Sequence, residues 1–346
     1  MKLKEFLKKK DIELSWKRYF IDALGAMAQG LFCSLLIGTI LDTVGDLTGW
    51  GLLNEIGDFA KTISGAAMAV AIGYALKAPN LVLFSLVLVG YAANFHGGAG
   101  GPLAVLIIAI IAAECGKLVS KETKIDVLVT PLVTIMAGVP LSALISPWIG
   151  KGASAFGTLV MRATELQPLL MGILVSVLVG IALTLPISSA AICAALGLTG
   201  LAGGAAVAGC CAQMVGFAVM SFRENRWGGL VSQGLGTSML QMGNIVRNPR
   251  IWIPPTVASA ITGPLATCLF KLEMNGPAVS SGMGTCGLVG QIGVYTGWVE
   301  SGHAITAWDW IGLVLICFVL PAILSWSLCF LLRKVGWIKE NDLKLN

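Results

Sequence analysis

The sequence has little charge for its length. Only 12% of its 346 residues are Asp, Glu, Lys or Arg, whereas 56% are hydrophobic and the mean hydropathy is +0.85. Soluble proteins usually carry about a quarter charged residues, which cover the surface that faces water. The composition therefore excludes an ordinary soluble protein and indicates that much of the surface faces lipid.

The sequence also has few of the residues that metal binding and covalent catalysis need. It contains two histidines, and its nine cysteines lie in or beside apolar stretches without a Cys-x-x-Cys pair. Such cysteines are typical of small buried side chains rather than of disulfides or zinc ligands. The sequence contains no Ser-His, paired-Asp or metal-ligand constellation, so we expect a protein that is not an enzyme and that holds no metal or cofactor.

Apolar runs long enough to cross a bilayer divide most of the chain. The eight predicted spans are residues 21–41, 63–76, 81–95, 103–119, 127–148, 169–185, 253–270 and 310–332. Basic residues crowd both ends, so the positive-inside rule predicts two cytoplasmic termini, an outer acidic loop at 42–58 and an inner basic loop at 117–124. We expect a basic or amphipathic N-terminal segment (1–19), one membrane domain (20–332) and a C-terminal tail (333–346).

Two uncharged, glycine-rich stretches differ from simple spans. They cover residues 185–209 and 275–293, and both contain proline and small hydroxyl side chains. Proline and glycine interrupt helices, and the freed backbone groups must then be buried in protein or line a wet cavity. The pattern predicts two re-entrant segments that hold a ligand near the midplane of the bilayer. The alternative is that the glycines only allow close helix packing.

Uncharged polar side chains concentrate between residues 213 and 248. Amide and hydroxyl groups both donate and accept hydrogen bonds, so they suit a neutral hydroxylated solute, on which Trp227 or Trp252 could stack. The alternative is that these groups only join helices. The predicted solute-binding residues are Gln213, Gln233, Thr237, Ser238, Gln241, Asn244 and, in the second glycine-rich stretch, Gln291.

Three titratable residues are weaker candidates. Glu165 is the last charge before a long neutral stretch, although a carboxylate at a helix start is also favourable against the helix dipole. His96 lies in a glycine-rich loop that either binds an anion or sugar hydroxyls or is only a tight connection. Glu114 lies on an apolar helix and is expected to pair with Lys117, unless it serves a coupling ion or the solute.

Five motifs, in this order along the chain, resemble a known family. They are LPISSAA (185–191), GCCAQMVGFAV (209–219), QGLGTSMLQ (233–241), NPRIWIPP (248–255) and GMGTCGLVGQ (282–291). Together they resemble the type 2 IIC-like membrane family of the bacterial phosphotransferase system, also called the perfringolysin O regulator family. The resemblance extends from about residue 20 to residue 332. It implies a sugar-transporter-like homodimer in the bacterial cytoplasmic membrane.

The resemblance also has departures. The chain has no soluble stretch that could serve as a IIA or IIB unit, so any phosphorylation of the solute would need separate IIA and IIB proteins. The Gly-Ile-x-Glu signature of better known sugar IIC domains is missing, unless residues 163–165 are its remnant.

The sequence thus predicts an all-α polytopic membrane protein that moves a small polar solute, a sugar or related metabolite, by alternating access. Its expected partners are the solute, the lipid bilayer and a second copy of the chain, and nucleic acid is not among them. The alternative function is a membrane-embedded sensor that regulates gene expression through a cytoplasmic partner docked on the basic N-terminal segment.

Overall fold

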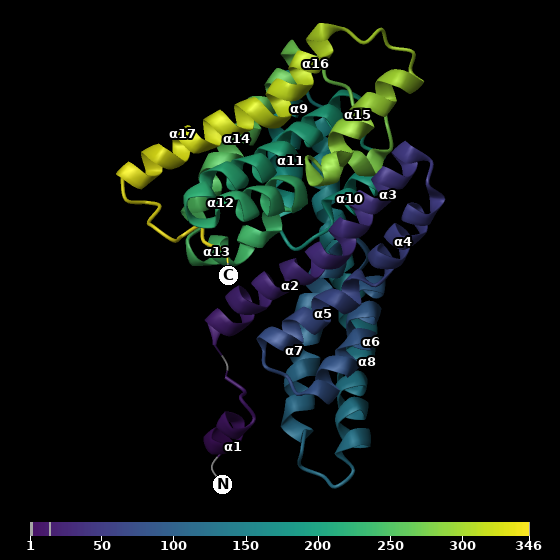
Figure 1. Ribbon diagram of the computed structural model, residues 1–346, viewed down its shortest axis with the longest axis vertical. Helices are drawn as coiled ribbons and strands as arrows, with labels where there is room; N and C mark the ends of the chain where they lie inside the picture. Colours follow the sequence, from purple (N-terminus) through teal and green to yellow (C-terminus); the bar gives the residue numbers. More distant parts are fainter. Residues whose placement is uncertain (1–2, 14, 346) are drawn as a thin grey trace. The chain divides into compact units, whose positions relative to one another are not determined.

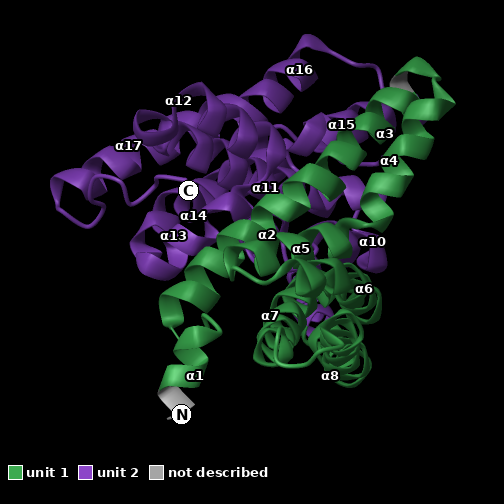
Figure 2. Cartoon of the chain, turned by 60° about the horizontal axis from the view of Figure 1, so that its bottom comes forward, with its two compact units in different colours: residues 1–152 green, residues 153–346 purple. Residues whose placement is uncertain are grey.

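The computed structural model describes residues 3–13 and 15–345, which form helices joined by short connections (Figure 1). The chain divides into two compact units, Met1–Gly152 and Ala153–Asn346, which Figure 2 distinguishes by colour. Each unit is described by itself below. Among the described residues five helices are long and apolar enough to cross a membrane, namely Arg18–Asp46, Asn80–Val119, Asp126–Thr164, Gly200–Met220 and Ala307–Lys334.

The first unit begins with a short helix and continues as a set of apolar helices. Its α-helices are α1 (Leu3–Lys9), α2 (Ala23–Leu31), α3 (Ile37–Thr48), α4 (Gly51–Thr62), α5 (Ser64–Ala75), α6 (Asn80–Gly97), α7 (Gly101–Val119) and the start of α8 (Asp126–Thr164), which continues into the second unit. Two π-helical turns, Arg18–Asp22 and Phe32–Leu36, join α2 to its neighbours in one continuous helix.

The helical run Asn80–Val119 contains two predicted spans rather than one. A turn at Gly98–Gly100 separates α6 from α7, and Gly98 has a φ of +50°, which a residue with a side chain rarely adopts. The two helices lie side by side after this turn (Figure 1). Close packing continues on α5, where a Cβ added at Gly65 would collide with the Gly90 carbonyl oxygen of α6.

The prediction of an acidic loop at residues 42–58 is wrong, because this stretch is helical. It forms the end of α3 and most of α4, which pack against each other across a turn at Gly49. Lys61 Nζ lies 2.7 Å from a carboxylate oxygen of Asp42, and Asn54 Nδ2 donates to the other oxygen at 3.1 Å. Asp46 and Asp58 are also paired within this helical hairpin, with Asn54 and Lys61. The left-handed conformation of Gly49 (φ +70°) allows the tight turn.

The second unit holds the remaining helices. They are the end of α8, then α9 (Pro168–Thr184), α10 (Ser189–Leu196), α11 (Gly200–Met220), α12 (Phe222–Val231), α13 (Met242–Arg247), α14 (Ile253–Pro264), α15 (Val289–Glu300), α16 (Ala307–Val314) and α17 (Leu320–Lys334). Short turns connect several of them, at Ser232–Gly236, Ser238–Gln241, Pro249–Trp252, Leu265–Leu269, Ala278–Gly282, Cys286–Leu288 and Leu315–Val319.

Glycines bring α9, α11 and α14 into backbone contact. A Cβ added at Gly209 of α11 would collide with the Ser176 carbonyl oxygen of α9, and one at Gly180 would lie 2.7 Å from the Gly209 carbonyl oxygen. Gly263 of α14 approaches Gly172 of α9 in the same way. Small residues thus permit the close approach that drives helix association in lipid.

The fold-class prediction is confirmed, and each of the eight predicted spans coincides with a helix or helical run. The stretch 185–209 breaks twice as expected, at residues 185–188 and at Gly197, which has a φ of +59°. It differs from the expectation in its second part, where the glycines after residue 200 open the unbroken helix α11. Backbone contacts such as that of Gly204 with the Leu272 carbonyl oxygen compensate for the low helix propensity of glycine.

The two glycine-rich stretches meet each other in the second unit. Ser189 Oγ at the start of α10 donates to the Gly282 carbonyl oxygen at 2.7 Å, and Ser281 Oγ donates to the Leu198 carbonyl oxygen at 2.6 Å. Gly200 and Met274 exchange backbone hydrogen bonds of 2.9 and 3.0 Å. The backbone groups that the helix breaks release are therefore satisfied by the partner segment, as non-helical backbone in a membrane protein requires.

Candidate functional site

Three predicted solute-binding residues form a connected set, here called the amide cluster: Gln233, Gln241 and Asn244. Gln233 lies in the turn Ser232–Gly236, Gln241 ends the turn Ser238–Gln241, and Asn244 is on α13. Gln241 Nε2 donates to Gln233 Oε1 at 2.8 Å, and Asn244 Nδ2 donates to Gln241 Oε1 at 2.8 Å. Gln233 and Gln241 are fully buried and Asn244 is 6% exposed. The short, broken turns of this segment place all three amides together.

The amide cluster holds the C-terminal tail, defined here as residues 336–345. Gln241 Nε2 donates to the Leu343 carbonyl oxygen at 2.9 Å, and Asn244 Nδ2 donates to the Lys344 carbonyl oxygen at 2.9 Å. Two apolar side chains anchor the tail, since Leu343 is fully buried and Ile338 is 2% exposed. Donors that the sequence analysis assigned to a solute therefore bind carbonyl oxygens of the chain itself.

Asn225 and Asn248 add further bonds to the tail. Asn225 Nδ2 donates to the Leu343 carbonyl oxygen at 2.8 Å, and its Oδ1 accepts a hydrogen bond from the Leu345 N–H at 2.9 Å. Asn248 Nδ2 donates to the Trp337 carbonyl oxygen at 2.9 Å. Asn225 was not among the predicted site residues, since no sequence pattern links it to a segment about 120 positions later.

A second polar group surrounds Gln213 of α11 and is here called the Gln213 cluster. Trp252 Nε1 donates to Gln213 Oε1 at 3.0 Å, and Gln213 Nε2 donates to Thr256 Oγ1 at 3.3 Å. Thr184 of α9 lies 2.8 Å from Ser238 Oγ and donates to Gln213 Oε1 at 3.3 Å. The cluster brings two predicted residues, Gln213 and Ser238, into one buried network and uses the Trp252 indole as a donor.

The other predicted residues lie outside these two clusters. Thr237 is 3% exposed, and its Oγ1 accepts a hydrogen bond from the Met239 N–H at 3.2 Å. Gln291 is 8% exposed, and with its amide nitrogen facing carbonyls it donates to Gly284 and Leu288 at 3.2 and 3.3 Å. Glu165 is exposed near the end of α8, and His96 is exposed near the end of α6 in the first unit.

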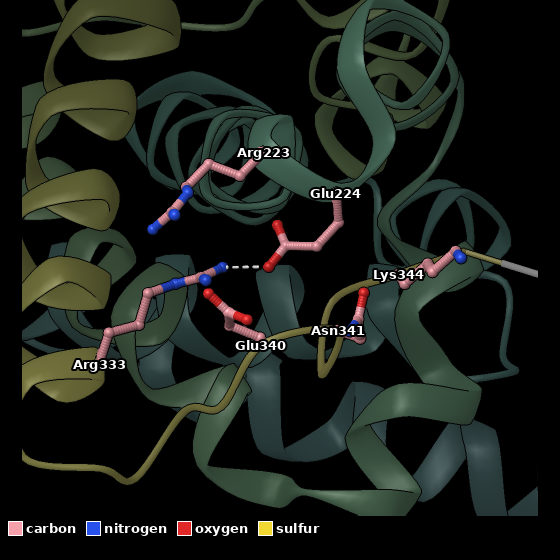
Figure 3. A pocket seen from close by; sticks show the side chains of 6 residues that line it. All are labelled: Arg223, Glu224, Arg333, Glu340, Asn341 and Lys344. Carbon is pink, nitrogen blue, oxygen red and sulfur yellow. Dashed lines mark hydrogen bonds and ion pairs between the residues drawn. The ribbon is translucent and has the colours of Figure 1, made fainter.

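A charged cavity of about 230 Å³ lies beside the C-terminal tail (Figure 3). Within it an oxygen of Glu224 from α12 pairs with the Arg333 guanidinium of α17 at 2.6 Å. The tail supplies one wall of the cavity. The lining residues are Arg223, Glu224, Arg333, Glu340, Asn341 and Lys344.

In the first unit the predicted Glu114–Lys117 ion pair is confirmed, with a separation of 3.1 Å. Lys117 is 1% exposed, and its ammonium also donates to the backbone carbonyls of Asp11 and Leu76 at 2.6 and 3.0 Å. Tyr19 donates to the second Glu114 oxygen at 3.1 Å. Glu114 and Lys117 thus bind the segment that follows α1 rather than facing an open path.

Two ion pairs hold the same N-terminal segment. Arg18 pairs with Asp11 at 3.0 Å, and its hydrogen bond keeps the pKa of the Asp11 carboxyl below its usual range. Lys10 lies 2.5 Å from a Glu122 oxygen, and this hydrogen bond likewise lowers the pKa of Glu122. Both carboxylates are therefore charged at neutral pH. The Asp11–Arg18 pair lies within the segment, and Glu122 attracts the segment from outside it.

Among residues 3–13 and 15–345 no three His, Cys, Asp or Glu side chains are grouped so that they could hold a metal ion.

In comparisons with known proteins, the family model described as "Phosphotransferase system, EIIC" matches residues 21–345. No curated protein and no solved structure matches the chain. The family match confirms the resemblance predicted from the five sequence motifs.

Proposed function

The chain belongs to the EIIC family of the phosphotransferase system and is a membrane transporter of that type. From this premise we propose that it carries a neutral hydroxylated solute, a sugar or a related metabolite. The amide cluster is the proposed binding site. One observation carries the proposal, namely that three buried and uncharged amides converge at helix breaks in the second unit. Amides suit hydroxyl groups because each can donate and accept at once.

The C-terminal tail gives this proposal a mechanism. Its Leu343 and Lys344 carbonyl oxygens accept hydrogen bonds from Gln241 and Asn244. Solute hydroxyl oxygens would need the same donors, so the solute and the docked tail compete for the cluster. We propose that the tail leaves the cluster in the state that binds solute and returns in the state that releases it, which makes tail docking one step of alternating access.

The remaining features of the transporter follow the family. We propose that both termini face the cytoplasm, that the bacterial protein acts as a homodimer, and that separate IIA and IIB proteins supply any phosphoryl group. The organisation is proposed as a basic N-terminal segment (1–19), one membrane domain (20–332) and a C-terminal region (333–346) that begins with the last residues of α17 and includes the tail. The contacts of Lys10, Asp11 and Arg18 within the first unit favour the transporter over a sensor, because these three side chains or carbonyls of the segment are already bound within the unit.

Solute binding to the purified protein tests the proposal. A panel of radiolabelled neutral sugars should include one that binds saturably, and Gln241→Ala should weaken its binding at least tenfold by removing a donor and an acceptor. Gln167→Ala is the matched control, because Gln167 is an exposed amide of the same unit whose side chain makes no capping hydrogen bond to α9. Equal solute affinity in both variants would show that the amide cluster is not the solute-binding site.

A further inference from the structure

We propose that the charged cavity beside the C-terminal tail binds a small hydroxylated anion, and that the bound anion holds the tail on the amide cluster. This inference concerns a second ligand and does not depend on which solute the transporter carries. Three observations support it: an excess of positive charge around the cavity, a buried carboxylate oxygen without a partner, and the position of the tail as one wall.

The positive charge comes from different parts of the unit. Arg223 of α12 and Arg333 of α17 line the cavity together with Lys344 of the tail, whereas Glu224 and Glu340 supply the negative charge. Glu224 is paired with Arg333, but among the described residues the Arg223 guanidinium and the Lys344 ammonium have no ion-pair partner. An anionic group in the cavity would provide one, and a guanidinium can bind carboxylate or phosphate with two hydrogen bonds.

Glu224 requires that the ligand also supply a hydrogen-bond donor. Its side chain is 6% exposed, and one oxygen binds Arg333 at 2.6 Å. The other oxygen, Oε2, is buried and has no hydrogen-bond partner among the described residues. Figure 3 shows the Glu224 carboxylate facing the same space as Arg223 and Arg333. A buried carboxylate oxygen is costly to leave unpaired, and a hydroxyl group of the ligand would satisfy it.

The size of the cavity and its walls define the ligand further. A volume of about 230 Å³ accommodates a molecule of roughly monosaccharide size. Lys344 lines the cavity, and its carbonyl oxygen accepts the Asn244 hydrogen bond. An anion that bridges α12 and Lys344 therefore stabilises the docked tail, by the general rule that a ligand favours the state it binds.

Isothermal titration calorimetry on the full-length protein in detergent tests the site. Glucose 6-phosphate and gluconate are the two hydroxylated anions, one a phosphate and one a carboxylate, and at least one should bind saturably and more weakly at high salt. Inorganic sulfate lacks a hydroxyl group and glucose lacks a charge, so each should bind at least tenfold more weakly. The proposal fails if neither hydroxylated anion binds, or if inorganic sulfate or glucose binds as tightly as they do.

Two matched variants locate the site on the chain. Arg223→Gln should lower the affinity for the better hydroxylated anion at least tenfold, whereas Lys339→Gln should leave it within twofold, because Lys339 belongs to the tail but does not line the cavity. Hydrogen exchange supplies a second readout, since the anion should slow exchange of the tail amides in wild type and not in Arg223→Gln. Equal affinities in the two variants, or tail exchange that the anion leaves unchanged, would overturn the proposal. Neutral sugar binding is measured separately, so failure here leaves the transport proposal standing.

Discussion

Replacing Gln241 by leucine should lower the free energy of unfolding of the second unit. The size of the loss can be worked out from the hydrogen bonds of the amide cluster. Gln241 is fully buried and takes part in three hydrogen bonds of 2.8 to 2.9 Å. Two of its partners keep another bond, since the Leu343 carbonyl still accepts from Asn225 and Asn244 Nδ2 still donates to Lys344. Gln233 Oε1 is left with no donor at all among the described residues.

The expected cost follows from these partners. A buried acceptor left unpaired costs about 1–3 kcal/mol, and each other lost bond contributes about 1 kcal/mol. Leucine fills a volume close to that of glutamine, so little cavity term is added. We therefore expect Gln241→Leu to lower the free energy of unfolding by about 3–5 kcal/mol, measured by equilibrium unfolding in mixed detergent micelles.

A double-mutant cycle separates this explanation from simple loss of packing. Adding Gln233→Leu removes the acceptor that Gln241→Leu leaves unpaired, so the double variant should cost about 1–3 kcal/mol less than the sum of the single variants. Additive effects of the two substitutions would refute the reasoning. So would a Gln241→Leu protein whose unfolding free energy lies within about 0.5 kcal/mol of wild type, which is the scatter expected for distant sites.

Three further predictions concern the rest of the chain. Gly209→Val should sharply reduce the yield of folded protein in size-exclusion chromatography, because its side chain would collide with backbone of α9, whereas Gly228→Ala, with nothing within 4 Å, should not. The Lys10–Glu122 pair should hold the N-terminal segment in place above about pH 4, the ordinary pKa of a glutamate. The segment should loosen as the pH falls through the lowered pKa of Glu122, which limited proteolysis would detect and which Glu122→Gln should reproduce at neutral pH. Truncation after Val335 should speed hydrogen exchange at the amide cluster and leave the first unit unchanged, and uniform exchange across both units would contradict the local role of the tail.

Much of the fold could be predicted because lipid imposes a simple rule on sequence. Apolar runs near twenty residues became helices, and proline or glycine at 185–188 and 197 marked the breaks. The acidic stretch 42–58 was predicted as a loop because hydropathy does not report ion pairs such as those of Asp42 and Asp58 with Lys61. The unbroken helix α11 was also unexpected, since tertiary contacts of its glycines override local propensity.

Only part of the candidate site could be predicted from the sequence. The clustering of Gln233, Gln241 and Asn244 follows from their short spacing in an uncharged stretch. Their main partner, the tail, comes from the other end of the second unit, and its contacts run mostly through backbone carbonyls. Backbone carbonyls are present at every residue, so no side-chain pattern could have indicated this pairing.

The most direct test of the account compares neutral sugar binding to two variants that should act in opposite directions. Asn225→Ala removes two hydrogen bonds that hold the tail and leaves the amide cluster intact. At about 1 kcal/mol per bond it should favour tail release by up to roughly thirtyfold. If the tail and the solute compete, Asn225→Ala should tighten sugar binding while Gln241→Ala weakens it. Weaker binding in both variants, or no change in either, would contradict the central claim.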